Sequence, residues 1–167
     1  NVLSVEWYES QFRDDDDIRR TYSLDKRIPI LEKMLSIIKH ADFRDESDFL
    51  WTATYLAKLY KEQASESSKA SFDLKALNLY TEILSVLRKT QPDNVSNITK
   101  ILEELSCLYW QQGNHIQAQS FFDEALDIWR KTSPIDNIQL IKALNSHANF
   151  YQRHQWDSLA LWLYKEA

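Results

Sequence analysis

The feature that most constrains this chain is an internal repeat, in which landmark residues return every 42 positions. A small residue recurs as Ala76, Ala118 and Ala160, and an aromatic residue follows each of them four positions later. Residues i and i+4 share one face of a helix, so each pair presents a small and a large side chain together. A period of this length is typical of helical hairpins that stack on their neighbours. The sequence therefore predicts an all-α chain, an α-solenoid of antiparallel helical hairpins.

The scarcity of turn residues supports the all-helical prediction. The chain contains one Gly and three Pro, whereas strand proteins need turn residues at intervals of about 8–12 positions. Hydrophobic residues make up 44% of the sequence, which is enough for a continuous core.

Charge and cysteine content exclude several functional classes. The net charge of -5 argues against a nucleic-acid partner, which usually requires a basic surface. A single cysteine, Cys107, excludes an intramolecular disulfide and fits a reducing compartment, so we expect a cytoplasmic protein. The sequence has no apolar run of about 18 residues, so we expect no membrane insertion. Because the chain begins with Asn1, we expect it to be part of a longer parent protein.

Apolar periodicity places the individual helices. We expect Pro29 in the first turn of the first one, where its missing N–H is tolerated. We expect Ser47 or Asp48 to cap the second helix and Asn97 to cap the fourth. The predicted helices are 25–40, 48–63, 73–90, 98–112, 117–132, 138–153 and 158–167.

The first full repeat is longer than the others. Sixteen positions separate Tyr60 from Ala76, whereas nine separate Tyr109 from Ala118, so this repeat carries a seven-residue insertion. The insertion forms either a loop or two extra helical turns. We expect one continuous domain made of a degenerate N-terminal repeat or cap (1–47), a repeat with the insertion (48–93), a regular repeat (94–136) and a truncated C-terminal repeat (137–167).

The residue spacing resembles a known repeat family. Residues 48–167 resemble the tetratricopeptide repeat, and the 42-residue period with its Lys-Thr-x-Pro linker resembles the kinesin light chain type. Arg88 and Arg130 replace the proline that usually ends the second helix, and His147 replaces a leucine. The resemblance implies a right-handed α-solenoid that binds proteins. It rests on Leu102, Leu105, Ser106, Tyr109, Gly113, Ala118, Phe122 and Ala125, and on Leu144, Asn145, Ala148 and Tyr151 of the next repeat.

We predict no enzymatic activity, cofactor or metal site. The four histidines lack a metal-binding spacing, and Cys107 has no flanking basic residue that would activate its thiol. The four aspartates at 14–17 could chelate a divalent cation, but a solvated acidic segment explains them better.

The resemblance also implies a concave groove, lined by the first helix of each hairpin, that holds a partner peptide. Asparagine amides can both donate and accept hydrogen bonds, and lysines favour a partner that carries carboxylates. The predicted groove residues are Trp51, Thr54, Lys58, Lys61, Lys100, Glu103, Cys107, Trp110, Lys142, Asn145, Asn149 and Gln152.

Two alternatives stay open at this point. Trp51, Trp110 and Trp156 either line the groove or seal junctions between repeats, whereas Tyr80, Phe122 and Tyr164 occupy expected core positions. A scaffold that binds a protein or peptide partner is the leading functional hypothesis. The alternative is a regulatory or sensor array within a larger signalling protein or enzyme.

Overall fold

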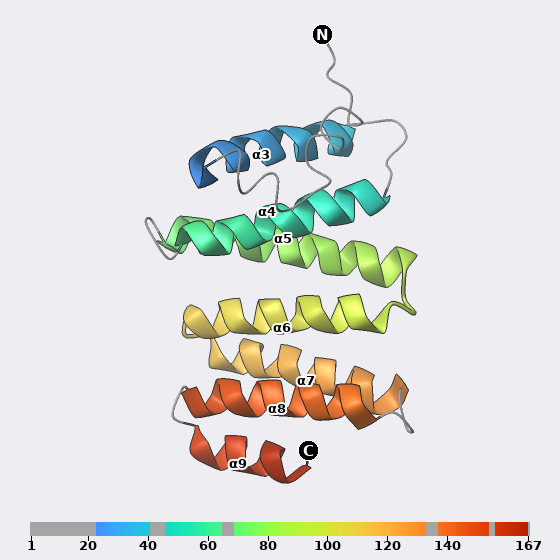
Figure 1. Ribbon diagram of the computed structural model, residues 1–167, viewed down its shortest axis with the longest axis vertical. Helices are drawn as coiled ribbons and strands as arrows, with labels where there is room; N and C mark the ends of the chain where they lie inside the picture. Colours follow the sequence, from blue (N-terminus) through green and yellow to red (C-terminus); the bar gives the residue numbers. More distant parts are fainter. Residues whose placement is uncertain (1–22, 41–45, 65–68, 133–136, 154–155, 167) are drawn as a thin grey trace. The chain divides into compact units, whose positions relative to one another are not determined.

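A computed structural model describes residues 23–40, 46–64, 69–132, 137–153 and 156–166. These ranges contain seven α-helices and no strand, which confirms the all-α prediction. The acidic segment at 14–17 lies outside the described residues. The helices, shown in Figure 1, are α3 (Leu24–His40), α4 (Glu46–Ala64), α5 (Lys69–Thr90), α6 (Val95–Gln111), α7 (His115–Thr132), α8 (Asn137–Arg153) and α9 (Asp157–Glu166).

Each of the seven helices begins one to four residues earlier than predicted, and in the first two this changes the role of three residues. Helix α3 starts at Leu24, so Pro29 lies inside the helix and removes one backbone hydrogen bond there. Helix α4 starts at Glu46, so neither Ser47 nor Asp48 is its cap. The acidic Glu46 and Asp48 instead complement the positive end of the helix dipole.

Asparagine side chains cap the helices of the central hairpin. The side-chain oxygen of Asn94 accepts a hydrogen bond from the backbone N–H of Asn97 at 3.3 Å, so Asn94 is the N-cap and the prediction for Asn97 is wrong. Asn114 accepts from the N–H of Gln117 in the same way. Between α6 and α7, Gly113 adopts a φ of 81°, a conformation that glycine takes without the steric cost of a Cβ atom.

Most of the insertion is helical. Helix α4 continues to Ala64, four residues past Tyr60, whereas α6 ends two residues past Tyr109. Helix α5 begins seven residues before Ala76, whereas α7 begins three residues before Ala118. The insertion thus lengthens both helices of this hairpin. Of the two predicted alternatives, a loop or extra helical turns, the structure agrees with the second.

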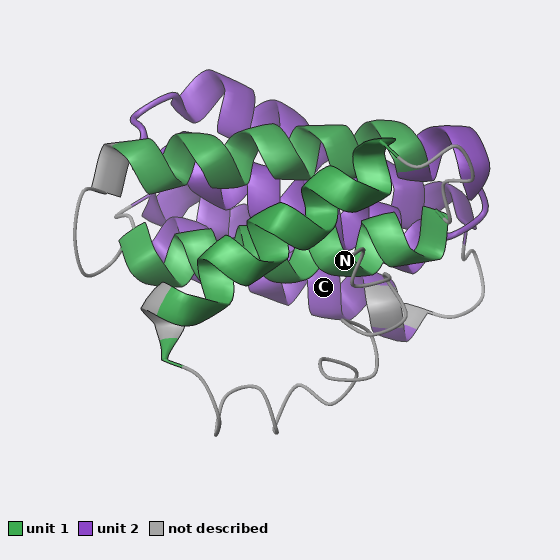
Figure 2. Cartoon of the chain, turned by 90° about the horizontal axis from the view of Figure 1, so that it is seen from above, with its two compact units in different colours: residues 1–86 green, residues 87–167 purple. Residues whose placement is uncertain are grey.

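The chain divides into two compact units, residues 1–86 and 87–167 (Figure 2). In unit 1, α3 packs against α4, and Tyr60 of α4 lies 5.9 Å from Phe72 of α5, measured between ring centroids. Leu31, Met34 and Phe49 are fully buried there. The unit boundary falls within α5, so the proposed division into repeats at 93/94 and 136/137 remains a prediction.

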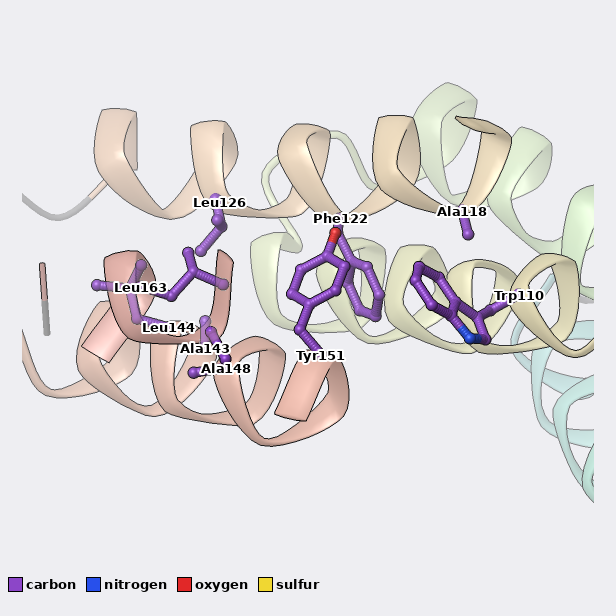
Figure 3. Close-up of a cluster of buried hydrophobic side chains, with 10 residues drawn as sticks. Trp110, Ala118, Phe122, Leu126, Ala143, Leu144, Ala148, Tyr151 and Leu163 are labelled. Carbon is purple, nitrogen blue, oxygen red and sulfur yellow. The ribbon is translucent and has the colours of Figure 1, made fainter. Parts of the chain in front are cut away.

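Unit 2 has a core to which both of its hairpins contribute. Ala118 is fully buried, and the hydroxyl of Ser106 on α6 donates to its carbonyl oxygen at 2.6 Å, so α6 and α7 approach closely. Figure 3 shows Phe122 of α7 against Tyr151 of α8. The core cluster consists of Trp110, Ala118, Phe122, Leu126, Ala143, Leu144, Ala148, Tyr151, Ala160 and Leu163.

The recurring small residues have similar environments, as the repeat predicts. Ala76, Ala118 and Ala160 are exposed by 0%, 0% and 2%. The recurring aromatic residues differ, because Tyr80 and Phe122 are buried whereas Tyr164 is 37% exposed. The core assignment of Tyr164 is therefore wrong. Helix α8 covers Phe122 through its residues His147, Phe150 and Tyr151. The described part of the chain has no helix after α9 that would cover Tyr164 in the same way.

Candidate peptide-binding surface

Residues at intervals of three and four positions bring the predicted side chains to one face of α6 and one face of α8. On α6, Lys100 is exposed, and Glu103 and Cys107 are half-buried. On α8, Lys142, Asn149 and Gln152 are exposed and Asn145 is half-buried. We call these seven residues the unit 2 face: Lys100, Glu103, Cys107, Lys142, Asn145, Asn149 and Gln152.

Unit 1 carries the four other predicted positions on a single helix. Trp51 and Lys58 of α4 are exposed, and Thr54 and Lys61 are half-buried. The Trp51 ring stacks on Tyr55 of the same helix, with 5.7 Å between the ring centroids. These side chains are at least partly accessible to solvent. They lie on α4 and do not belong to the unit 2 face.

Trp110 is a correction to the predicted groove. Only 5% of this residue is exposed, because it belongs to the core cluster of unit 2. Its ring centroid lies 5.1 Å from that of Phe150 and 5.6 Å from that of Tyr151, both on α8. Trp156, which immediately precedes α9, packs on it at 5.0 Å between ring centroids. Trp110 therefore seals the junction between the two hairpins and does not line an open surface.

A tyrosine that the sequence assigned to the core instead orients part of the unit 2 face. The phenol of Tyr164 lies 2.6 Å from Oδ1 of Asn149, to which it donates, and 3.2 Å from Oε1 of Gln152. Asn149 thus uses its acceptor oxygen within the protein and offers a ligand its amide N–H groups. The alignment with Tyr80 and Phe122 gave no signal of this role.

The carboxylate on the unit 2 face lies near a buried histidine. Oε1 of Glu103 lies 3.7 Å from Nε2 of His147, which is fully buried behind it. Lys100 and Lys142 are exposed on the neighbouring turns. The face therefore presents two ammonium groups to solvent, while its carboxylate is oriented toward the buried imidazole.

A metal site and a membrane span each have requirements that the described residues do not meet. They contain no group of three or more His, Cys, Asp or Glu side chains that could hold a metal ion. Within the same ranges, none of the helices combines the length and apolar character needed to cross a membrane. Cys107 packs against the core cluster, His40, His115 and His147 lie on three different helices, and His154 lies outside the described residues.

Comparisons with known proteins support the fold. No protein-family model matches the sequence, and no curated protein matches it either. Among solved structures, the chain is similar to BtubC (BKLC) from P. vanneervenii, with a TM-score of 0.68 and 15% sequence identity. The similarity covers 95% of this chain and 60% of BtubC, so the chain spans less than two thirds of that protein. The fold is thus an all-α, tetratricopeptide-like helical repeat.

Proposed function

We propose that this chain is a protein-interaction scaffold that binds an extended peptide segment of a partner along the unit 2 face. The observation that supports this most directly is the arrangement of α6 and α8 over their shared core. Both helices carry polar side chains at matching positions of successive repeats, while most of the residues between those positions on each helix are buried. The helical-repeat fold is consistent with a role in protein interaction.

The chemistry of the face favours a peptide that carries carboxylates. Asn145 and Asn149 lie one helical turn apart on α8, where their amides can bond to successive polar groups of an extended backbone. Lys100 and Lys142 attract acidic side chains and increase the rate of encounter. The Trp51, Thr54, Lys58 and Lys61 side chains of α4 offer an equivalent surface in unit 1.

A triple substitution on α8 tests this proposal. Peptides selected from a displayed random library against the wild-type chain provide the probe, and fluorescence anisotropy gives their Kd. We expect Lys142→Ala combined with Asn145→Ala and Asn149→Ala to weaken binding on the order of 100-fold, at about 1 kcal/mol for each lost contact. The far-UV circular dichroism stays unchanged, because alanine favours helix at each position.

A matched control uses exposed lysines on the second helices of the hairpins. Lys89→Ala combined with Lys131→Ala removes two positive charges outside the predicted face and leaves the Kd unchanged. Raising the salt from about 0.15 to 1 M shortens the Debye length from about 8 to 3 Å and weakens the wild-type complex. The proposal is wrong if the triple variant retains wild-type affinity or if the control variant loses affinity equally.

A further inference from the structure

Unit 1 contains a cavity that the peptide-binding proposal does not use. Its volume is about 350 Å³, within the range of small-molecule sites. Its lining includes Leu35 of α3, Leu56 of α4 and Leu79 of α5. These three leucines are exposed by only 6%, 1% and 8%, so they give the cavity an apolar lining.

Helix geometry separates this cavity from the predicted groove residues of α4. Leu56 and Tyr60 line the cavity, and they lie one turn apart on the same side of the helix. Lys58 lies midway between them in sequence, about 200° around the helix from each, at about 100° per residue. The cavity therefore opens on the side of α4 opposite Lys58.

Two ion pairs between α3 and α5 frame the cavity. Lys75 of α5 lies 3.0 Å from Glu32 of α3, and Lys39 of α3 lies 2.5 Å from Glu82 of α5. In each helix the two partners are seven residues apart, or about 10 Å along the axis at 1.5 Å per residue. An extended peptide of four residues already spans about 13 Å. The opening thus suits a compact molecule better than a peptide chain.

The lining itself holds two lysines, each paired with a carboxylate, and the carboxylate paired with Lys39 lies outside the lining. Lys39 and Lys75 both line the cavity, whereas Glu32 is its only acidic lining residue among those described. Oε1 of Glu32 accepts hydrogen bonds from both Tyr60 and Lys75. Burial acts to raise the pKa of Glu32, but these two hydrogen bonds and the charge of Lys75 outweigh it and lower that pKa.

One lysine can exchange its partner at little cost. The Lys39–Glu82 pair is exposed by 35% on each side, and pairs at such surfaces contribute only about 0–1 kcal/mol. A ligand carboxylate can replace Glu82 beside Lys39 while Glu32 keeps its two donors. Ser36 and Asn78 add polar groups to the same lining.

We propose that the cavity between α3 and α5 of unit 1 binds a compact monocarboxylate, with its apolar body on the three leucines and its carboxylate at Lys39. The site is independent of the unit 2 face, so either proposal can fail without the other.

Nuclear magnetic resonance titration of the full chain with 4-phenylbutanoate tests the proposal. We expect saturable shifts of backbone amides at 35–39 and 75–79, with a Kd at least about tenfold lower than that of the neutral 4-phenylbutanamide. A matched pair of variants locates the site. Ser36→Trp fills the opening and abolishes the shifts, whereas Ser85→Trp places the same side chain on an exposed part of α5 outside the lining and preserves them.

Three outcomes would overturn the proposal. The first is the absence of saturable shifts at millimolar ligand concentrations. The second is equal affinity for the acid and the amide, because Lys39 would then not bind the carboxylate charge. The third is binding that survives Ser36→Trp, which would place the ligand elsewhere on the protein.

Discussion

Replacing Phe122 with alanine is expected to lower the free energy of unfolding by about 3–5 kcal/mol. Phe122 is 3% exposed, and its ring centroid lies 4.2 Å from that of His147 and 5.0 Å from that of Phe150. The substitution removes buried apolar surface and leaves a cavity where α7 meets α8. Urea unfolding followed by circular dichroism measures the change from the shift in midpoint.

The adjacent residue provides a matched control. Phe121 is half-buried and stacks on Tyr109 at 5.5 Å between ring centroids, away from the contacts of Phe122 with α8. Phe121→Ala is expected to destabilise the protein by about 1–2 kcal/mol. The loss is smaller because folding buries less apolar surface of Phe121 than of Phe122. Equal losses for the two variants would show that Phe122 has no special role in joining the hairpins.

Replacing His147 with leucine is expected to stabilise the protein by about 1–3 kcal/mol, the usual cost of a buried polar group without a hydrogen bond. His147 is fully buried, and neither ring nitrogen has a hydrogen-bond partner among the described residues. Its nearest carboxylate, that of Glu103, is 3.7 Å away, beyond hydrogen-bond distance. Leucine is also the residue type that the repeat resemblance places at this position.

Two further variants separate the loss of a polar group from a change in packing. His147→Ala removes the same nitrogens but leaves a cavity, so it is expected to be less stable than His147→Leu. Glu103→Gln removes the only ion-pair partner found for His147 among the described residues and should change stability by less than about 1 kcal/mol. If His147→Leu is instead destabilising, the electrostatic interactions of the imidazole with Asp123 and Glu103 outweigh the cost of burying it.

The fold was predictable because the sequence patterns that indicate it are periodic and involve residues close together in the chain. Ala76, Ala118 and Ala160 are buried alike, as their spacing requires, and each helix lies within a few residues of its predicted bounds. The errors concern helix starts. Asn94 and Asn97 are both good capping residues, and only the backbone conformation decides which of them caps α6.

The candidate site was less predictable because exposure depends on what the neighbouring helix supplies. Trp110 occupies a groove position by its spacing, but Phe150 and Tyr151 of α8 enclose it, together with Trp156, which precedes α9. Tyr164 occupies a core position by its spacing, but it reaches Asn149 at the surface. The cavity of unit 1 had no sequence signal, because its ion pairs join residues 43 positions apart on separate helices.

The central claim is that adjacent hairpins of unit 2 share one interior, so that they unfold together. Native-state hydrogen exchange, measured residue by residue on the wild-type chain and the Phe122→Ala variant, tests it most directly. We expect that in the Phe122→Ala variant the opening free energies of amides around Leu144 and Ala148 in α8 fall by the same amount as those in α7. Unchanged protection in α8, with loss confined to α6 and α7, would contradict it.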